Sequence, residues 1–358
     1  MKNKRHLKLV GVFGLALVVL ILVFVSACAS PAPAPAPAPT PAPLAPELPE
    51  VEWFLQVFQA TRTTLPVPQF DDLAERVAGK TDGKFKIQVA GPGELGITQE
   101  AFPLALTSGL VDACYLLTGA LEKSIPSVGI FGLPGLAVSL EEWNEVVSAM
   151  QEIVAPEMKK QGFQLASHDS FYFDWPQQML SRKPIEDMTD LDGLKVRVWR
   201  KVDEKLMKVL NAEPLYLDFG EVYMAMQRGV VEALITGSTP MLNAHLYEVG
   251  KNWYDVRLPG GVVYFAVNTK SFEALPDKYK GILREEADRW TEICRSNIAV
   301  EIDKAHSSLK EKGIQMNELT TAEREAWRVA ALAIWEEWAT ETPEKTRAME
   351  IARKTTGY

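Results

Sequence analysis

Cysteine and histidine are scarce in this sequence, and the catalytic motifs that use them are missing. Of 358 residues, 3 are cysteine and 4 are histidine. Cys28, Cys114 and Cys294 lie more than eighty residues apart, which excludes a disulfide framework and does not match a metal-ligand spacing. The sequence also lacks a Gly-x-Ser-x-Gly elbow, a His-Glu-x-x-His pair and any Walker or Rossmann glycine pattern. His168-Asp169 has no nucleophile beside it, so these absences weigh against a hydrolase or a nucleotide-dependent enzyme.

A surplus of basic residues is absent as well. The 38 Lys and Arg against 47 Asp and Glu give a formal net charge of -9, which argues against nucleic acid as a partner, because binding to phosphates requires concentrated positive charge. Hydrophobic residues make up 47% of the chain and charged residues 24%, so a packed core is expected and a disordered chain is excluded. The length predicts two core-forming units.

The first 28 residues have the organisation of an export signal. Four basic residues precede an uninterrupted apolar run from Leu9 to Val25, as in a secretory signal peptide, although an uncleaved anchor of that length could also span a bilayer. The next residues, Val25-Ser26-Ala27-Cys28, resemble the bacterial lipobox, in which the chain is cut before the cysteine and the thiol carries a diacylglycerol. Cys28 is therefore the predicted lipidation site. Cleavage would leave 34 basic against 47 acidic residues, a charge of -13.

Residues 29–50 are predicted to form a tether. From Pro31 to Pro46 proline alternates mostly with alanine, a composition that favours an extended polyproline conformation and offers no apolar face to bury. At about 3.1 Å per residue this segment reaches about 60 Å, enough to hold a globular body clear of lipid headgroups. A proline-rich ligand for a partner domain is the alternative interpretation.

From Val51 onward, strand and helix patterns alternate, which predicts an α/β protein with sheets covered on both faces. The expected strands are 51–58, 85–90, 113–117, 164–169, 194–199, 213–217, 232–236 and 262–268. The expected helices are 68–81, 98–108, 140–160, 201–211, 220–228 and 241–247.

An internal repeat indicates two similar lobes. Residues 105–113, Ala-Leu-Thr-Ser-Gly-Leu-Val-Asp-Ala, recur 120 positions later as residues 225–233, Ala-Met-Gln-Arg-Gly-Val-Val-Glu-Ala. Both segments are typical of a helix that ends at a glycine and is followed by a strand.

Two helices are expected in the carboxyl-terminal part. Residues 277–312 contain no proline and carry spaced apolar side chains, which predicts one helix of about ten turns. Because it is too long for one lobe, we expect it to cross both; its irregular heptads disfavour a coiled coil. In a further helix over 321–339, Trp327, Trp335 and Trp338 recur at helical spacing, and core packing is favoured over ligand binding.

The strand at 194–199 holds the candidate binding residue. In strand alternation Leu194, Val196 and Val198 face a core, whereas Lys195, Arg197 and Trp199 face the other side. An arginine on a covered sheet needs an anionic partner, and its planar fork suits a carboxylate. The residues alone leave two interpretations open: an ion pair with a local acid, or a site for an anionic ligand.

Several segments together resemble one family, the DctP-type substrate-binding proteins of tripartite ATP-independent periplasmic (TRAP) transporters. The resemblance covers roughly residues 52–315. It is carried by Leu191-Asp-Gly-Leu-Lys-Val-Arg197, Leu210-Asn-Ala-Glu-Pro214, residues 220–232, Leu246-Tyr-Glu-Val-Gly-Lys251 and Asn268-Thr-Lys-Ser-Phe-Glu-Ala-Leu-Pro276. It implies a two-lobed periplasmic-binding-protein-like fold with a ligand cleft between the lobes and a long helix across both.

The resemblance also implies a site. The arginine of the Leu-Lys-x-Arg strand clamps the substrate carboxylate in the family, and that position is Arg197. A second polar residue about twenty positions earlier corresponds to Gln177, where many members carry arginine, so the ligand is expected to bear one anionic group. Thr236 and Ser238 offer hydroxyls where relatives place Glu or Asn, which puts a bound metal in doubt. Trp175 and Trp199 are candidate aromatic walls, with core packing equally open.

We therefore expect an extracytoplasmic lipoprotein, on the periplasmic or outer face of the membrane, that captures a small carboxylate and passes it to TRAP-type permease subunits. No cofactor, metal or nucleic acid is expected, and whether the protein dimerises is open. The alternatives are an enzyme and a ligandless sensory or scaffold protein on the same fold. The predicted parts are the signal at 1–28, the tether at 29–50, lobe I at 51–174 and 263–302, and lobe II at 175–262 and 303–358.

Overall fold

The computed structural model describes residues 47–57, 65–91, 94–137, 139–174 and 176–357. The predicted signal with Cys28, most of the tether, and Trp175 lie outside these residues. The chain divides into Met1–Glu47 and Leu48–Tyr358. The second unit contains every helix and strand that the described residues form.

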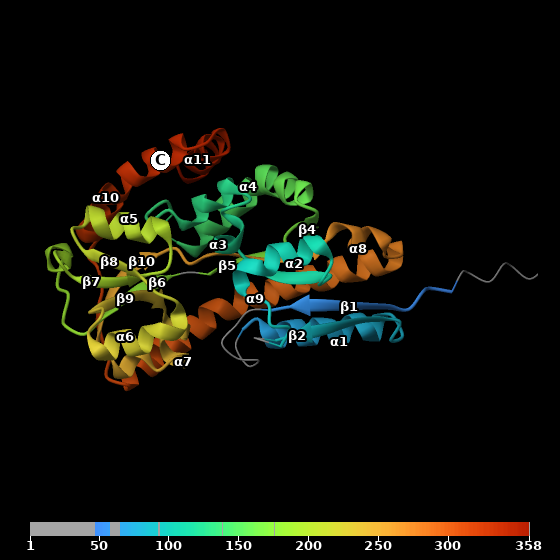
Figure 1. Ribbon diagram of the computed structural model, residues 1–358, viewed down its shortest axis with the longest axis horizontal. Helices are drawn as coiled ribbons and strands as arrows, with labels where there is room; N and C mark the ends of the chain where they lie inside the picture. The colour runs from blue at the N-terminus through green and yellow to red at the C-terminus, as the bar shows by residue number, and fades with distance from the viewer. Residues whose placement is uncertain (1–46, 58–64, 92–93, 138, 175, 358) are drawn as a thin grey trace, which may run out of the picture. The chain divides into compact units, whose positions relative to one another are not determined.

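One sheet is built from the amino-terminal strands and one late strand (Figure 1). Its strands are β1 (Val51–Gln56), β2 (Phe85–Ala90), β3 (Ala113–Leu117), β4 (Phe163–Leu165), β5 (Phe171–Asp174) and β11 (Gly261–Asn268). Their order is β2-β1-β3-β11-β4, and β5 also pairs with β11. β1 is parallel to β2 and β3, whereas β11 is antiparallel to its neighbours. All of β11 is buried, as expected for a central strand covered on both faces.

The other sheet is built from the middle of the chain. Its strands are β6 (Gln177–Ser181), β7 (Lys195–Val198), β8 (Glu213–Tyr216), β9 (Ala233–Gly237), β10 (Asn252–Leu258) and β12 (Gln315–Asn317), in the order β12-β10-β6-β9-β7-β8. The chain crosses from one sheet to the other between β5 and β6, and returns between β10 and β11. The two sheets define two lobes.

Eleven helices lie within the described residues. They are α1 (Val67–Lys80), α2 (Phe102–Ser108), α3 (Thr118–Leu121), α4 (Leu140–Lys160), α5 (Lys201–Val209), α6 (Val222–Arg228), α7 (Ser238–Asn243), α8 (Thr269–Ala274), α9 (Asp277–Glu311), α10 (Thr321–Thr340) and α11 (Pro343–Thr356). Two short 3-10 turns matter for the site and the core, η2 (Pro126–Gly132) and η4 (Phe219–Glu221). None of the helices in this described part is long and apolar enough to cross a membrane.

The long helix α9 packs on both lobes, as predicted. Its first half places Tyr279, Leu283 and Trp290 in the core of the first sheet with α1, while Leu309 belongs to the core of the second sheet. The buried residues of α9 from Tyr279 to Ile298 recur every three or four positions, and Ala305 and Leu309 continue the series after one seven-residue step, which gives α9 one apolar stripe. Figure 1 shows α9 running obliquely from the side of α8 and β1 to the side of α6 and α7.

The internal repeat is confirmed element by element. The helices α2 and α6 end at Gly109 and Gly229, which adopt nearly the same left-handed backbone, with φ 76° and ψ 18° against φ 74° and ψ 18°. The strands β3 and β9 follow, beginning at Ala113 and Ala233. Glycine is favoured at both helix ends because a left-handed residue without Cβ carries little strain.

The tryptophans of α10 pack in the core, as predicted. Trp327, Trp335 and Trp338 are 5%, 1% and 5% exposed, and Trp335 Nε1 donates a hydrogen bond to the carbonyl oxygen of Pro134 at 2.9 Å. The following helix, α11, was not predicted. It packs against α4 and η2 of the first lobe, whereas α10 contacts α5 of the second.

Some predicted elements were wrong. The strand expected over 164–169 is the short β4, which ends at Leu165, and His168 and Asp169 are exposed in the turn that follows. The strands β5, β6, β10 and β12 were missed.

Cys114 and Cys294 are buried free thiols, and burial raises the pKa of both well above the usual range.

Candidate functional site

Arg197 lies on a strand enclosed by neighbours on both sides. β7 pairs in parallel with β8 and β9, with Arg197 opposite Leu215 and Leu234. The resemblance implies that Arg197 reaches a ligand cleft, but its face of the sheet is covered and Arg197 is only 4% exposed. Leu234 packs there with Val222 and Met226 of α6, while Val196 and Val198 enter the core on the opposite side. Burial on both faces is the reason for the difference.

Two backbone carbonyls hold the guanidinium of Arg197 in place. Nε donates to the oxygen of Leu217 at 3.0 Å, and Nη1 donates to the oxygen of Ile235 at 3.1 Å. Both acceptors are neutral, and within the described residues no carboxylate forms an ion pair with Arg197. The guanidinium is thus fixed in orientation while its charge has no paired anion there.

The electrostatics of the described residues reflect this imbalance. Burial lowers the pKa of Arg197 to about 10, and the charges of Asp203, Tyr216 and Asp218 oppose part of that shift. The group stays protonated at neutral pH, because a pKa of about 10 is well above 7. A desolvated cation gains most from an anion that reaches it with good hydrogen-bond geometry.

An aromatic ring that the sequence analysis missed lies over this guanidinium. The ring centroid of Phe219, in η4 just before α6, is 5.9 Å from the Arg197 guanidinium carbon. Phe219 is 38% exposed, so one part of the ring is open to solvent while another faces a cation. Its position at the start of the helix that follows β8 was the available signal, since polar and aromatic residues at strand ends commonly face a ligand.

Thr236 and Ser238 follow Leu234, the strand partner of Arg197, at the end of β9 and the start of α7. They are 5% and 2% exposed. The register pairs Arg197 with Leu234, so the two-residue alternation places Thr236 on the same face of the sheet as Arg197. Thr236 thus shares a face with Arg197, and Ser238 lies two residues further along, at the first position of α7.

Gln177 takes the opposite face. It pairs with Gly237 at the start of β6, and a Cβ on Gly237 would lie 3.3 Å from Gln177 Nε2. The side chain is 5% exposed and lies against the strand crossing between β10 and β11. The structure does not place Gln177 on the same face as Arg197.

Trp199 is half-buried just after β7, and its ring contacts another cation. The Arg200 guanidinium carbon lies 4.7 Å from the ring centroid. Arg200 also forms a bidentate ion pair with the buried carboxylate of Asp203: Nε donates to Oδ2 at 2.8 Å and Nη2 donates to Oδ1 at 2.7 Å. Across the lobe boundary, burial raises the pKa of Asp174 to about 6, and the charge of Arg200 opposes part of that rise. Trp199 thus packs against an arginine that is already paired.

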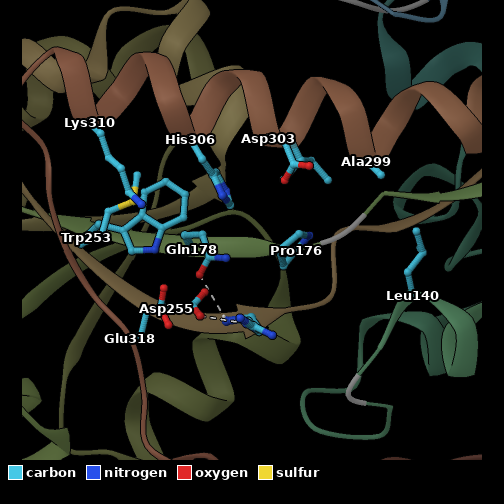
Figure 2. Close-up of a pocket in the computed structure, with 13 residues that line it drawn as sticks. Leu140, Pro176, Gln178, Trp253, Asp255, Ala299, Asp303, His306, Lys310 and Glu318 are labelled. Carbon is cyan, nitrogen blue, oxygen red and sulfur yellow. Dashed lines mark hydrogen bonds and ion pairs between the residues drawn. The ribbon is translucent and has the colours of Figure 1, made fainter.

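A pocket of about 320 Å³ opens between α9 and the second sheet (Figure 2). Gln178, Trp253 and His306 are among its lining residues, whereas Arg197, Gln177, Trp199, Thr236 and Ser238, the predicted site residues that the structure describes, do not line it. In the described part of the chain no group of three or more His, Cys, Asp or Glu residues is arranged to hold a metal ion.

Two α/β lobes, joined by two strand crossings and a shared helix, define a solute-binding protein fold. The chain belongs to the DctP family, the bacterial extracellular solute-binding proteins of family 7, whose model matches residues 59–342. This is a family of solute receptors, not of enzymes. The sequence-based assignment to TRAP substrate-binding proteins is therefore confirmed.

Three similar proteins illustrate the family. The C4-dicarboxylate-binding periplasmic protein DctP of Rhodobacter capsulatus is 27% identical over 280 residues, which cover 76% of this chain and 80% of that protein. An extracytoplasmic solute receptor of Bordetella pertussis that binds pyroglutamic acid has a TM-score of 0.76 at 19% identity, covering 85% of this chain and 99% of its own. A TRAP periplasmic solute-binding protein of Roseobacter denitrificans, with bound β-D-glucuronate, has a TM-score of 0.76 at 21% identity, covering 84% and 99%.

Proposed function

We propose that this protein captures a small organic acid outside the cytoplasm through Arg197 and delivers it to a TRAP-type membrane permease. The observation that carries the proposal is a buried guanidinium held by two backbone carbonyls, with no carboxylate paired to it in the described residues. An entering carboxylate would supply the missing negative charge and accept hydrogen bonds from the remaining N–H groups of the guanidinium.

The similar proteins support this class of ligand. The receptors named above bind C4-dicarboxylate, pyroglutamic acid and glucuronate. All three ligands carry a carboxylate. The resemblance implies a second arginine at the position of Gln177, and on that basis the proposed ligand has one carboxylate, with Thr236 and Ser238 available for its neutral polar groups. Gln177 itself lies on the opposite face of the sheet from Arg197. Phe219 joins the site as an aromatic wall, and Trp175 and Trp199 remain candidates for the same role.

The proposed cycle uses the two lobes. The strands separate into two sheets, which supports a lobe I of residues 51–174 and 263–302 and a lobe II of residues 175–262 and 303–342. Helix α11, which the sequence analysis assigned to lobe II within 303–358, packs instead against α4 and η2 of lobe I. A ligand that contacts both lobes shifts a hinge equilibrium towards closure. Cys28 would carry the lipid, and the tether would keep the receptor near its permease at the membrane surface.

The test compares two arginine variants. Native mass spectrometry of the purified protein identifies a retained acid, and thermal unfolding is then measured with that acid, pyroglutamate, glucuronate and succinate. We expect the melting temperature to rise with a bound acid, because the ligand stabilises only the folded state. Arg197→Met should abolish the rise, whereas Arg228→Met, which removes an exposed guanidinium on α6, should retain it. An unchanged rise in Arg197→Met would reject the clamp, and the absence of any stabilising acid would favour a ligandless protein.

A further inference from the structure

The pocket beneath α9 is separate from the Arg197 site and is lined by several elements. Gln178 enters from β6, Trp253 from β10, Ile302 and His306 from α9, and Leu140 from the start of α4. Figure 2 shows His306 directed from α9 towards the strands that carry Trp253 and Gln178. Its volume of about 320 Å³ is at the lower end of the range for small-molecule sites.

Two buried polar atoms in this pocket have no hydrogen-bond partner within the described residues. Gln178 is 1% exposed; its Oε1 accepts from the backbone N–H of Arg257 at 3.4 Å, while its Nε2 has no acceptor. His306 Nε2 is also buried without a partner. Buried polar groups are nearly always hydrogen-bonded, and one left unpaired destabilises the folded protein. The pocket is therefore built to be filled by something that offers hydrogen bonds.

The protonation state of His306 decides which hydrogen bonds its ring can make with a ligand in the pocket. Burial lowers the pKa of His306; Lys310 and Arg257 lower it further, and Asp255 and Asp303 oppose the change. The imidazole is thus neutral at pH 7 and presents one N–H donor and one lone pair. Its ring packs edge-on against Trp253, with ring centroids 4.9 Å apart, which fixes its orientation.

The charges around the pocket do not suit the anion proposed for Arg197. Asp255 is paired with Arg257 at 2.8 Å and with Arg324 at 3.5 Å. The exposed rim carries two acids, Asp303 and Glu318, and two bases, Lys310 and Arg257, of which Arg257 is already paired with Asp255. Among the described residues that line the pocket, no positive charge is buried without a partner to attract a carboxylate. Inside, the pocket offers neutral hydrogen-bonding atoms beside the apolar surfaces of Trp253, Ile302 and Leu140.

From these observations we infer that the pocket beneath α9 is a second binding site, for a small uncharged polyhydroxy compound. One hydroxyl oxygen of the ligand accepts from Gln178 Nε2, and the same or a neighbouring hydroxyl donates to His306 Nε2. The C–H face of the ligand packs on Trp253. A single hydroxyl can both accept and donate, so this class satisfies the two orphan atoms without bringing a charge into the protein.

The probes are glycerol, xylitol and myo-inositol, and their binding to the full protein is measured by saturation-transfer NMR and by titration of tryptophan fluorescence. We expect at least one probe to bind the wild type. His306→Phe keeps a ring against Trp253 but removes the lone pair, and should weaken binding about tenfold. The matched control is His168→Phe, which makes the same change at an exposed position and should leave binding unchanged, as should Arg197→Met.

Other outcomes would overturn the site. Equal affinities in His306→Phe and the wild type would place the polyol elsewhere, and failure of every probe to bind the wild type would leave ordered water as the occupant. Should His306→Phe fail to fold, the site is tested instead with Gln178→Met and with a wild-type crystal soaked with the bound probe. Density for the probe against Gln178 Nε2 supports the site, and density for water alone rejects it. Loss of acid binding in Arg197→Met with polyol binding retained keeps this inference distinct from the proposed function.

Discussion

Gly260 lies directly against Gln177 at the crossing between the lobes. A Cβ atom on Gly260 would fall 2.8 Å from Gln177 Nε2 and 2.2 Å from the carbonyl oxygen of Asp174. The second contact is with backbone, which cannot move aside as a flexible side chain can. Gly260, between β10 and β11, must therefore lack a side chain if β5 and β6 are to keep their positions.

This contact predicts opposite effects for two glycine-to-alanine changes. Gly260→Ala should lower the free energy of unfolding by about 2 kcal/mol or more, because the added methyl overpacks the crossing. Gly281→Ala, in α9 where nothing lies within 4 Å of the new Cβ, should raise it by about 0.5–1 kcal/mol through helix propensity. Denaturant unfolding measures both. Similar changes in the two variants would show that the crossing relaxes around a methyl group.

Asp174 predicts a pH-dependent stability. Its folded pKa of about 6 exceeds an unfolded value of about 3.9, so the native state binds the proton more tightly. Stability from this group is then present below about pH 4 and is lost as the pH rises to about 6. Relative to Asp174→Asn, the wild type should lose up to about 3 kcal/mol across that interval. A constant difference between the two unfolding free energies from pH 4 to pH 7 would contradict this.

The attachment of α11 to the first lobe should depend on apolar packing rather than on its ion pair. Ala348 and Ala352 are fully buried, whereas Arg347 and Glu152 form a 3.1 Å ion pair with both side chains more than half exposed. Ala352→Asp buries an unpaired charge and should cost about 3 kcal/mol or more. Arg347→Ala should cost less than about 1 kcal/mol. Thermal unfolding of both variants tests this. A larger loss of stability in Arg347→Ala than in Ala352→Asp would show that the ion pair, not apolar packing, attaches α11.

The spacing of apolar residues and the helix-capping residues in the sequence predicted most of the helices. The helix ends at Gly109 and Gly229, the long α9 and the core role of Trp335 follow from spacing and capping, and the structure confirms them. Helix α11 also carried a local signal that was overlooked: Thr342 caps its first turn and Pro343 occupies its first position.

The rest depends on contacts between distant segments. The strands β5 and β6 were missed because only Trp175 and Pro176 separate them while they join different sheets. The strand β10 contains an irregularity near Arg257, which has φ 45°, and this interrupts the expected alternation. For the site, sequence singled out Arg197, but its burial is set by α6 packing across the sheet, and the opposite face taken by Gln177 follows from the pairing of β6 with β9.

The 120-residue correspondence between the lobes makes the molecule its own reference for mutational work. Gly109 and Gly229 share one backbone geometry in two surroundings, as do the strands that begin at Ala113 and Ala233. The same substitution introduced at both members of a pair separates what the shared local geometry contributes from what each lobe's neighbours add. A different effect of the same substitution in the two lobes then shows how far the surroundings of equivalent positions have diverged.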